Sequence, residues 1–152
     1  MGLSTYMRAS KGFYKSLDAK DYNKIAEVLE DIVPLDIGEK HNATRNIEIQ
    51  IPIATWHKGY SVDNYLWEKA GSPERDEYVL DLYEDDIKTM IEEARRIQDD
   101  PNAVSEYLAD YFVDEDDTDW IQIQFQRLER ALTDYLLDNR LKGWTLTVWR
   151  SY

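Results

Sequence analysis

The sequence predicts an α+β fold, with a small and mostly antiparallel sheet of about three strands and about four to five helices packed on it. Three observations favour this fold class. Residues 46–53 alternate apolar and polar side chains with the period of a strand, several longer segments repeat apolar residues with the period of a helix, and the strand-like segments lie far apart in the chain. With 152 residues and no internal repeat or linker, the chain is expected to form a single domain over residues 1–152.

The N-terminal part is predicted to contain a strand followed by a helix. Residues 3–9 fit a short strand. A helix capped by Ser16 or Asp18 should run to about Val33 and end at Pro34, because the residue before a proline is disfavoured in helical conformation. The apolar face of this helix consists of Tyr22, Ile25, Val28, Leu29 and Ile32.

The clearest strand pattern follows. Four isoleucines at alternate positions, Ile47, Ile49, Ile51 and Ile53, predict a strand that buries its isoleucine face. Because Pro52 has no N–H to donate, this strand should lie at an edge of the sheet or contain a bulge. Gly59 ends it. Ser61 then caps a short helix, closed by residues 71–73, whose inward side chains include Val62, Tyr65 and Leu66.

The second half is predicted to contain three helices and a final strand. The helices are expected over residues 82–98, over residues 102–113, and from Thr118 or Asp119 to about Leu141. Their inward positions are Ile87, Met90, Ile91, Ala94 and Ile97 in the first; Val104, Tyr107, Leu108, Tyr111 and Phe112 in the second; and Ile121, Phe125, Leu128, Leu132, Tyr135 and Leu136 in the third. Gly143 fits a left-handed cap. Residues 144–149 alternate as a strand, which we expect beside the first strand.

Negative charge is concentrated in one region. The chain has 18 basic and 31 acidic residues, a net charge of −13. Residues 76–119 contain 17 acidic and 3 basic residues, a net charge of −14, whereas residues 1–75 contain 11 and 10. Such a field repels nucleic acid and anionic membranes and attracts basic partners. We therefore expect no direct binding of nucleic acid and no membrane association.

These acidic residues fall on the predicted outer faces of two helices. A helix rises about 1.5 Å per residue and duplex DNA carries one charge per ~1.7 Å, so a carboxylate-rich helix approaches the charge density of a phosphate backbone. The region is therefore predicted to mimic nucleic acid and to occupy a basic groove on another protein; the alternative is a surface that serves only solubility. The predicted partner-binding residues are Asp81, Glu84, Asp85, Glu92, Glu93, Asp99, Asp100, Glu106, Asp110 and Asp114.

Residues 56–64 form a second candidate site, at a strand-to-helix turn. Lys58 beside a protonated His57 would attract an anion such as a nucleotide in an otherwise acidic protein. A catalytic role for His57 would also need a nucleophile and an orienting group within reach, which proximity in sequence does not establish. The alternative places Trp56 in the core. The candidate ligand-binding residues are Trp56, His57, Lys58, Tyr60, Asp63, Asn64 and Trp67.

Several chemistries are excluded by composition and motif. The absence of cysteine excludes disulfides, thiolate metal sites and cysteine nucleophiles. The acidic loop from Asp114 has Asp119 and Phe125 where a calcium-binding EF-hand needs Gly and Glu. The sequence has no Gly-rich phosphate loop. We expect no metal, no cofactor and no enzymatic activity. Because no apolar run approaches the ~20 residues of a membrane span or forms a signal peptide, we expect a cytoplasmic protein.

Three stretches carry a resemblance: residues 1–7, residues 55–67 and residues 144–152. Together they resemble a family of small tailed-phage proteins of uncharacterised function, whose members often begin Met-Gly-Leu-Asp-Met-Tyr-Leu and contain Tyr-Trp-Arg-Lys. The present chain departs from these motifs at Ser4 and His57, which stand where the family has Asp and Arg. The resemblance implies a phage accessory protein in a bacterial host. Small acidic proteins of this class often resemble inhibitors of host defence.

The residues and the resemblance together favour an acidic phage-type interaction protein. It would inhibit a host defence protein by presenting its acidic helical face to a basic nucleic-acid-binding surface. One alternative is a small-molecule or nucleotide-binding protein, or a small enzyme, that acts through residues 56–64. Another is a structural or assembly role in the phage. Aromatic side chains on the last strand would also permit a homodimer.

Overall fold

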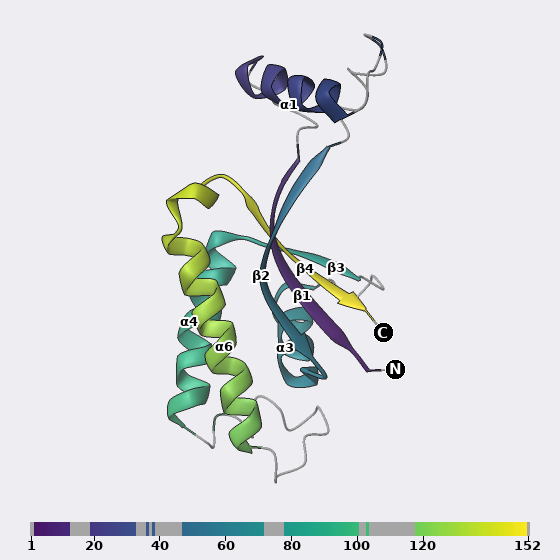
Figure 1. The fold of residues 1–152 in the computed structure, drawn as a ribbon. Coiled ribbons are helices and arrows are strands. Elements are labelled where there is room, and N and C mark those ends of the chain that lie inside the picture. Colours follow the sequence, from purple (N-terminus) through teal and green to yellow (C-terminus); the bar gives the residue numbers. More distant parts are fainter. Residues whose placement is uncertain are drawn as a thin grey trace. The chain divides into compact units, whose positions relative to one another are not determined.

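The predicted α+β class is confirmed by the computed structural model (Figure 1), whose described residues form one small antiparallel sheet of four strands together with four α-helices. The structure describes residues 2–12, 19–32, 36, 38, 47–71, 78–100, 103 and 118–151. In chain order, the elements are β1 (Ser4–Gly12), α1 (Ala19–Ile32), β2 (Glu48–His57), α3 (Tyr60–Ala70), β3 (Val79–Leu82), α4 (Glu84–Asp99), α6 (Thr118–Leu137), the 3₁₀ helix η2 (Asn139–Leu141) and β4 (Thr145–Ser151).

The strand order is β2-β1-β4-β3, so the first and last strands are neighbours, as predicted. The position of β2 at the edge of the sheet agrees with Pro52, which has no N–H for a second neighbouring strand. Strand β3 pairs antiparallel with β4, with Leu80 opposite Val148 and Leu82 opposite Leu146. The sequence did not predict β3, because four residues, three of them apolar, are too few to establish a period.

The chain separates into two compact units. One consists of residues 1–9 and 51–152, and the other of residues 10–50. The smaller unit contains α1, which forms as predicted, although Val28 and Ile32 on its predicted apolar face are exposed. The larger unit contains α3, α4, α6 and β3. A single domain over residues 1–152 stays a prediction.

The core of the larger unit lies between the sheet and helices α3, α4 and α6. All five inward positions predicted for α4 are buried, and so are four of those predicted for α6: Ile121, Phe125, Leu128 and Leu132. The strands contribute Met7, Trp56, Leu80, Leu82, Leu146 and Val148 to the same cluster. Tyr65 of α3 meets Phe125 of α6 edge to face, with ring centroids 5.3 Å apart. The helical periods therefore identified the buried faces correctly, except that Leu136 is partly exposed.

The burial predicted for Ile49 and Ile51 of β2 was wrong, although Ile53 on the same predicted face packs against the core. Ile49 and Ile51 are 38% and 39% exposed, whereas Trp56 is fully buried and Ala54 packs against the core. Trp56 and Ala54 lie on the strand face opposite to the isoleucines. Alternation identifies the residues that share a face of a strand. It does not show which of the two faces the core covers, because a shift of the strand by one residue exchanges them.

Two further features bear on the sequence predictions. Gly143 has a φ of +83°, which agrees with the left-handed conformation predicted after the last helix. The predicted helix over residues 102–113 falls almost wholly outside the described residues. Within the described ranges, none of the helices combines the length and the apolar character needed to cross a lipid bilayer.

Candidate functional site

The outer surface of α4 carries a stripe of exposed carboxylates. Asp85, Glu92 and Asp99 are all exposed and follow one another at intervals of seven residues. Seven residues rotate a helix by almost two full turns and advance it by about 10.5 Å, so the three carboxylates lie on nearly the same side of α4. Within the described part of the chain, none of these three carboxylates forms an ion pair. We call these three residues the α4 stripe.

The first turn of α4 explains why acidic residues gather at its start. Tyr83 precedes the helix and provides no side-chain cap, so the positive end of the helix dipole is faced by Glu84, Asp85 and Asp86. Lys88 Nζ lies 2.6 Å from Glu84 Oε1. Its hydrogen bond and charge hold the pKa of Glu84 below its ordinary value. Glu84 therefore stays ionised, but Lys88 offsets its charge.

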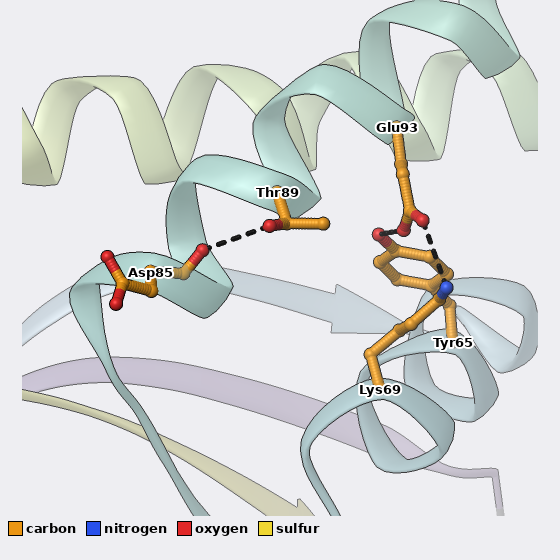
Figure 2. Close-up of polar contacts among 5 residues, drawn as sticks. All are labelled: Tyr65, Lys69, Asp85, Thr89 and Glu93. Atoms are coloured by element: carbon orange, nitrogen blue, oxygen red, sulfur yellow. Dashed lines mark hydrogen bonds and ion pairs between the residues drawn. The ribbon is translucent and has the colours of Figure 1, made fainter.

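Glu93 occupies a different position from the α4 stripe. Figure 2 shows its carboxylate reaching toward Tyr65 and Lys69 of α3, whereas Asp85 lies away from them at the start of the helix. It accepts a hydrogen bond from the Tyr65 hydroxyl and another from Lys69 Nζ at 2.9 Å. Only 17% of the Glu93 side chain is exposed. The prediction that Glu93 faces solvent was therefore wrong, because this carboxylate joins α4 to α3.

A third ion pair neutralises a positive charge on the outer surface of α4. Arg95 Nε donates to Glu129 Oε1 of α6 at 2.6 Å, and Gln98 Nε2 donates to the other carboxylate oxygen at 2.8 Å. The hydrogen bond from Arg95 is the main reason that the pKa of Glu129 lies below its ordinary value. Arg95 is therefore engaged with α6, although it lies on the same helix as the α4 stripe.

The remaining predicted acidic residues divide into three groups. Asp81 is exposed on β3 and accepts a hydrogen bond from Thr147 Oγ1 at 3.1 Å. Asp99 and Asp100 are exposed at the end of α4. The predicted residues Glu106, Asp110 and Asp114 lie outside the described residues, in the stretch 101–117, which has six acidic residues and no basic one.

The second candidate site, around residues 56–64, is divided between core and surface. Gly59 allows the chain to turn closely over Trp56, since a Cβ at this position would lie 2.6 Å from the Trp56 Cβ. Trp56 is fully buried and Asp63 is 1% exposed. Both are part of the packed interior, which agrees with the alternative that placed Trp56 in the core.

Asp63 is held in a network that ties three elements together. It accepts hydrogen bonds from Thr5 Oγ1 at 2.8 Å and from Arg150 Nη2 at 2.6 Å. The guanidinium carbon of Arg150 lies 3.9 Å from the centre of the Trp67 ring. Arg150 therefore holds Asp63 and Trp67 of α3 against β4. Thr5 connects Asp63 to β1 in the same way. No sequence pattern indicates a role for Arg150, which lies 87 positions from Asp63.

The exposed part of this segment consists of His57, Lys58 and Tyr60, with Asn64 half-buried. His57 Nδ1 lies 3.0 Å from Ser4 Oγ, a hydrogen bond that joins the end of β2 to the start of β1. Lys58 has a φ of +54°, an uncommon value for a residue with a side chain. Its backbone N–H donates to the carbonyl of Leu3 at 2.8 Å. The turn therefore presents a histidine and a lysine on a backbone that is tied to the start of β1.

The described residues contain no cluster of three or more histidine and carboxylate side chains that could hold a metal ion. Comparison with known proteins adds no relative: no family model, no curated protein and no solved structure matches this chain. The functional interpretation therefore depends on the α4 stripe, the surrounding charges and the turn at residues 57–60.

Proposed function

We propose that this chain is a non-enzymatic binding protein that uses the outer surface of α4 to engage the basic, nucleic-acid-binding surface of a partner protein. The α4 stripe is the observation that carries the proposal. Asp85, Glu92 and Asp99 are exposed on one side of the helix, while neighbouring carboxylates such as Glu93 and Glu129 are used in contacts inside the molecule. The α4 stripe therefore has charge left for a partner.

The charge arithmetic indicates how such a surface would compare with DNA. The α4 stripe spans about 21 Å, and duplex DNA of that length carries about twelve phosphates. Three carboxylates supply only part of that charge. The six acidic residues of the stretch 101–117, together with Asp119 at the start of α6, would supply much of the rest. Mimicry of nucleic acid thus requires α4 and this stretch to act together.

The resemblance to tailed-phage proteins supports a bacterial host protein as the partner, and inhibition of a defence protein as the outcome. A partner that normally binds nucleic acid would present lysine and arginine side chains, which the α4 stripe attracts. The interaction would be sensitive to salt, because the Debye length is about 8 Å at physiological ionic strength and shortens as salt is added.

The test is capture of proteins from a nuclease-treated bacterial lysate on the immobilised chain. Proteins bound through the α4 stripe should be released by duplex DNA and by about 0.5 M salt, since both compete for or screen the same charges. The variant Asp85→Asn, Glu92→Gln, Asp99→Asn should lose this DNA-releasable fraction.

A matched control carries the same charge change elsewhere. The variant Glu27→Gln, Asp31→Asn, Asp134→Asn alters three exposed carboxylates on α1 and α6 and should capture as the wild type does. Capture that persists at about 0.5 M salt would contradict a specific role for α4. The same conclusion would follow if both variants lowered capture equally.

A second candidate function is anion binding at the exposed turn of residues 57–60. The observation in its favour is Lys58, whose positive φ is a conformation that clusters at functional sites. A thermal-shift screen of mono-, di- and cyclic nucleotides would test it. A stabilisation of the wild type that disappears in the variant His57→Ala, Lys58→Ala would favour this function over the α4 stripe.

A further inference from the structure

A cavity of about 460 Å³ lies where α4 begins and α6 ends. Figure 1 shows that these two helix ends lie at the same end of the α4–α6 pair. Tyr83 and Glu84 line the cavity from the start of α4, Tyr135 and Leu136 from the end of α6, and Trp144 from the segment that leads into β4. Its volume falls in the range of about 300–1,000 Å³ that is typical of ligand pockets.

Hydrogen bonds hold the walls of this cavity in place. The Asp138 side chain accepts from the backbone N–H of Arg140 at 3.0 Å and from Arg140 Nη2 at 2.7 Å, which fixes the turn after α6. The Tyr135 hydroxyl donates to the carbonyl of Trp144 at 2.7 Å. Burial and the charge of Glu84 raise the pKa of Tyr135, so its hydroxyl stays a donor. The end of α6 and the segment before β4 are therefore held together at the cavity.

The lining combines aromatic rings with three charged side chains, Glu84, Asp138 and Lys142, and Asp138 is paired with Arg140. Tyr83 is 67% exposed at the rim, and Tyr135 and Trp144 are half-buried. Lys88 Nζ pairs with Glu84 at Oε1. The first-turn carboxylates of α4 already face the positive end of the helix dipole, so an anion would meet repulsion here. Aromatic faces beside a carboxylate are instead suited to a cation.

We propose that this cavity accommodates an arginine side chain of the partner protein. A guanidinium is planar and weakly hydrated, so it stacks on an aromatic ring such as Tyr83 while it donates to a carboxylate such as Glu84. Its aliphatic stem would pack on Leu136. This inference rests on the proposed function and deepens it: the α4 stripe attracts a basic surface, and the cavity beside its first residue, Asp85, receives one arginine from that surface.

The experiment is calorimetric titration of the full chain at low salt with a short peptide of alternating glycine and arginine. Lysine and citrulline versions of the peptide separate guanidinium recognition from general attraction, because citrulline keeps the shape and loses the charge. We expect the arginine peptide to bind, the lysine peptide to bind at least about threefold more weakly, and the citrulline peptide not to bind.

Two variants and two matched controls locate the binding. Tyr83→Ala and Glu84→Gln should each weaken binding of the arginine peptide about fivefold or more. Tyr78→Ala removes another exposed tyrosine outside the cavity. Asp134→Asn neutralises an exposed carboxylate that also pairs with a base four residues away, Arg130. Each control should change the affinity less than about twofold. The four positions are exposed, so their variants should fold, and thermal unfolding checks this.

The outcomes separate this inference from the proposed function. If the α4 stripe variant loses binding while Tyr83→Ala and Glu84→Gln behave as their controls, the cavity proposal is overturned and the α4 surface stands. If the cavity variants lose binding while the α4 stripe variant does not, the cavity proposal stands and the role of the stripe falls. Equal binding of the lysine peptide overturns the assignment to arginine. Absence of binding by the wild type overturns the cavity proposal altogether.

Discussion

Two groups of carboxylates in this protein have the same chemistry and opposite uses. Asp63 and Glu93 are buried or nearly so, and each is surrounded by donors from other elements: Arg150 and Thr5 for Asp63, Tyr65 and Lys69 for Glu93. The carboxylates of the α4 stripe are exposed and form no ion pair within the described residues. Removal of the first group should affect stability and spare binding, whereas removal of the second should do the reverse. The predictions below test this contrast, beginning with the largest effect.

Deletion of residues 144–152 should unfold the larger unit. It removes β4, which lies between β1 and β3 in the sheet, and with it Leu146 and Val148 from the core. It also leaves Asp63 buried without Arg150. The loss of two core side chains alone costs about 4 kcal/mol or more, a large part of the stability of a domain this size. Far-ultraviolet circular dichroism and a cooperative urea transition would check it, and a folded truncated chain would show that β4 is dispensable.

Arg150→Met should destabilise the protein by about 3–5 kcal/mol, because it strands a buried carboxylate. The double variant Arg150→Met, Asp63→Asn should recover part of this loss, since the remaining amide is uncharged. Urea unfolding of the wild type, both single variants and the double variant gives the coupling energy. Additive losses would mean that Asp63 and Arg150 do not depend on each other.

Glu93→Ala and Glu92→Ala form a matched pair on adjacent positions of α4. The first should cost about 1–3 kcal/mol, because the Tyr65 hydroxyl and Lys69 lose their acceptor. The second should change stability by no more than about 0.5 kcal/mol and should weaken capture of a basic partner. Urea unfolding and the capture assay are measured on both. If the two variants exchange these effects, the contrast between inner and outer carboxylates is wrong.

The smallest effect concerns pH. Because Arg95 and Gln98 hold the pKa of Glu129 below its ordinary value of 4.5, its ionised form favours the folded state. This contribution is present above the ordinary pKa and is lost as the pH falls through the lowered one. Glu129→Gln should therefore lower stability at neutral pH and reduce the decline below about pH 4.5. Urea midpoints measured from neutral to acidic pH check this prediction. If the wild type and Glu129→Gln lose stability equally as the pH falls, the pair with Arg95 contributes nothing.

Sequence patterns predicted the helices well and the charge networks poorly. The period of α4 identified all five of its buried residues, because a helix of 16 residues repeats its pattern several times. The same type of pattern misassigned Ile51, since alternation along β2 does not reveal which side the helices cover. The exposure of individual side chains was also not predictable from the sequence. Glu92 and Glu93 are neighbours in sequence, yet only the folded structure shows that Glu93 contacts Tyr65.

The candidate site was predictable to the same limited extent. Residues 76–119 stood out as acidic, and most of the carboxylates described between residues 81 and 100 are indeed exposed. The partner that withdraws Glu93 from binding, Lys69, comes from a distant segment. The same holds in the second candidate site, where Arg150 engages Asp63. The cavity at the start of α4 needs Tyr83, Tyr135 and Trp144 together, and no local pattern links these residues.

The central place of β4 has a consequence for synthesis of the chain on the ribosome. Strands β1 and β3 have no common neighbour until residues 145–151 have emerged, although β1 is translated first. Until then the apolar sides of β1, α4 and α6 have an incomplete sheet to pack on. Completion of this sheet closes a loop of more than a hundred residues, a topology that folds slowly compared with local hairpins. The nascent protein would therefore expose apolar surface until β4 has emerged. A chaperone that covers apolar surface would have its largest effect before that point.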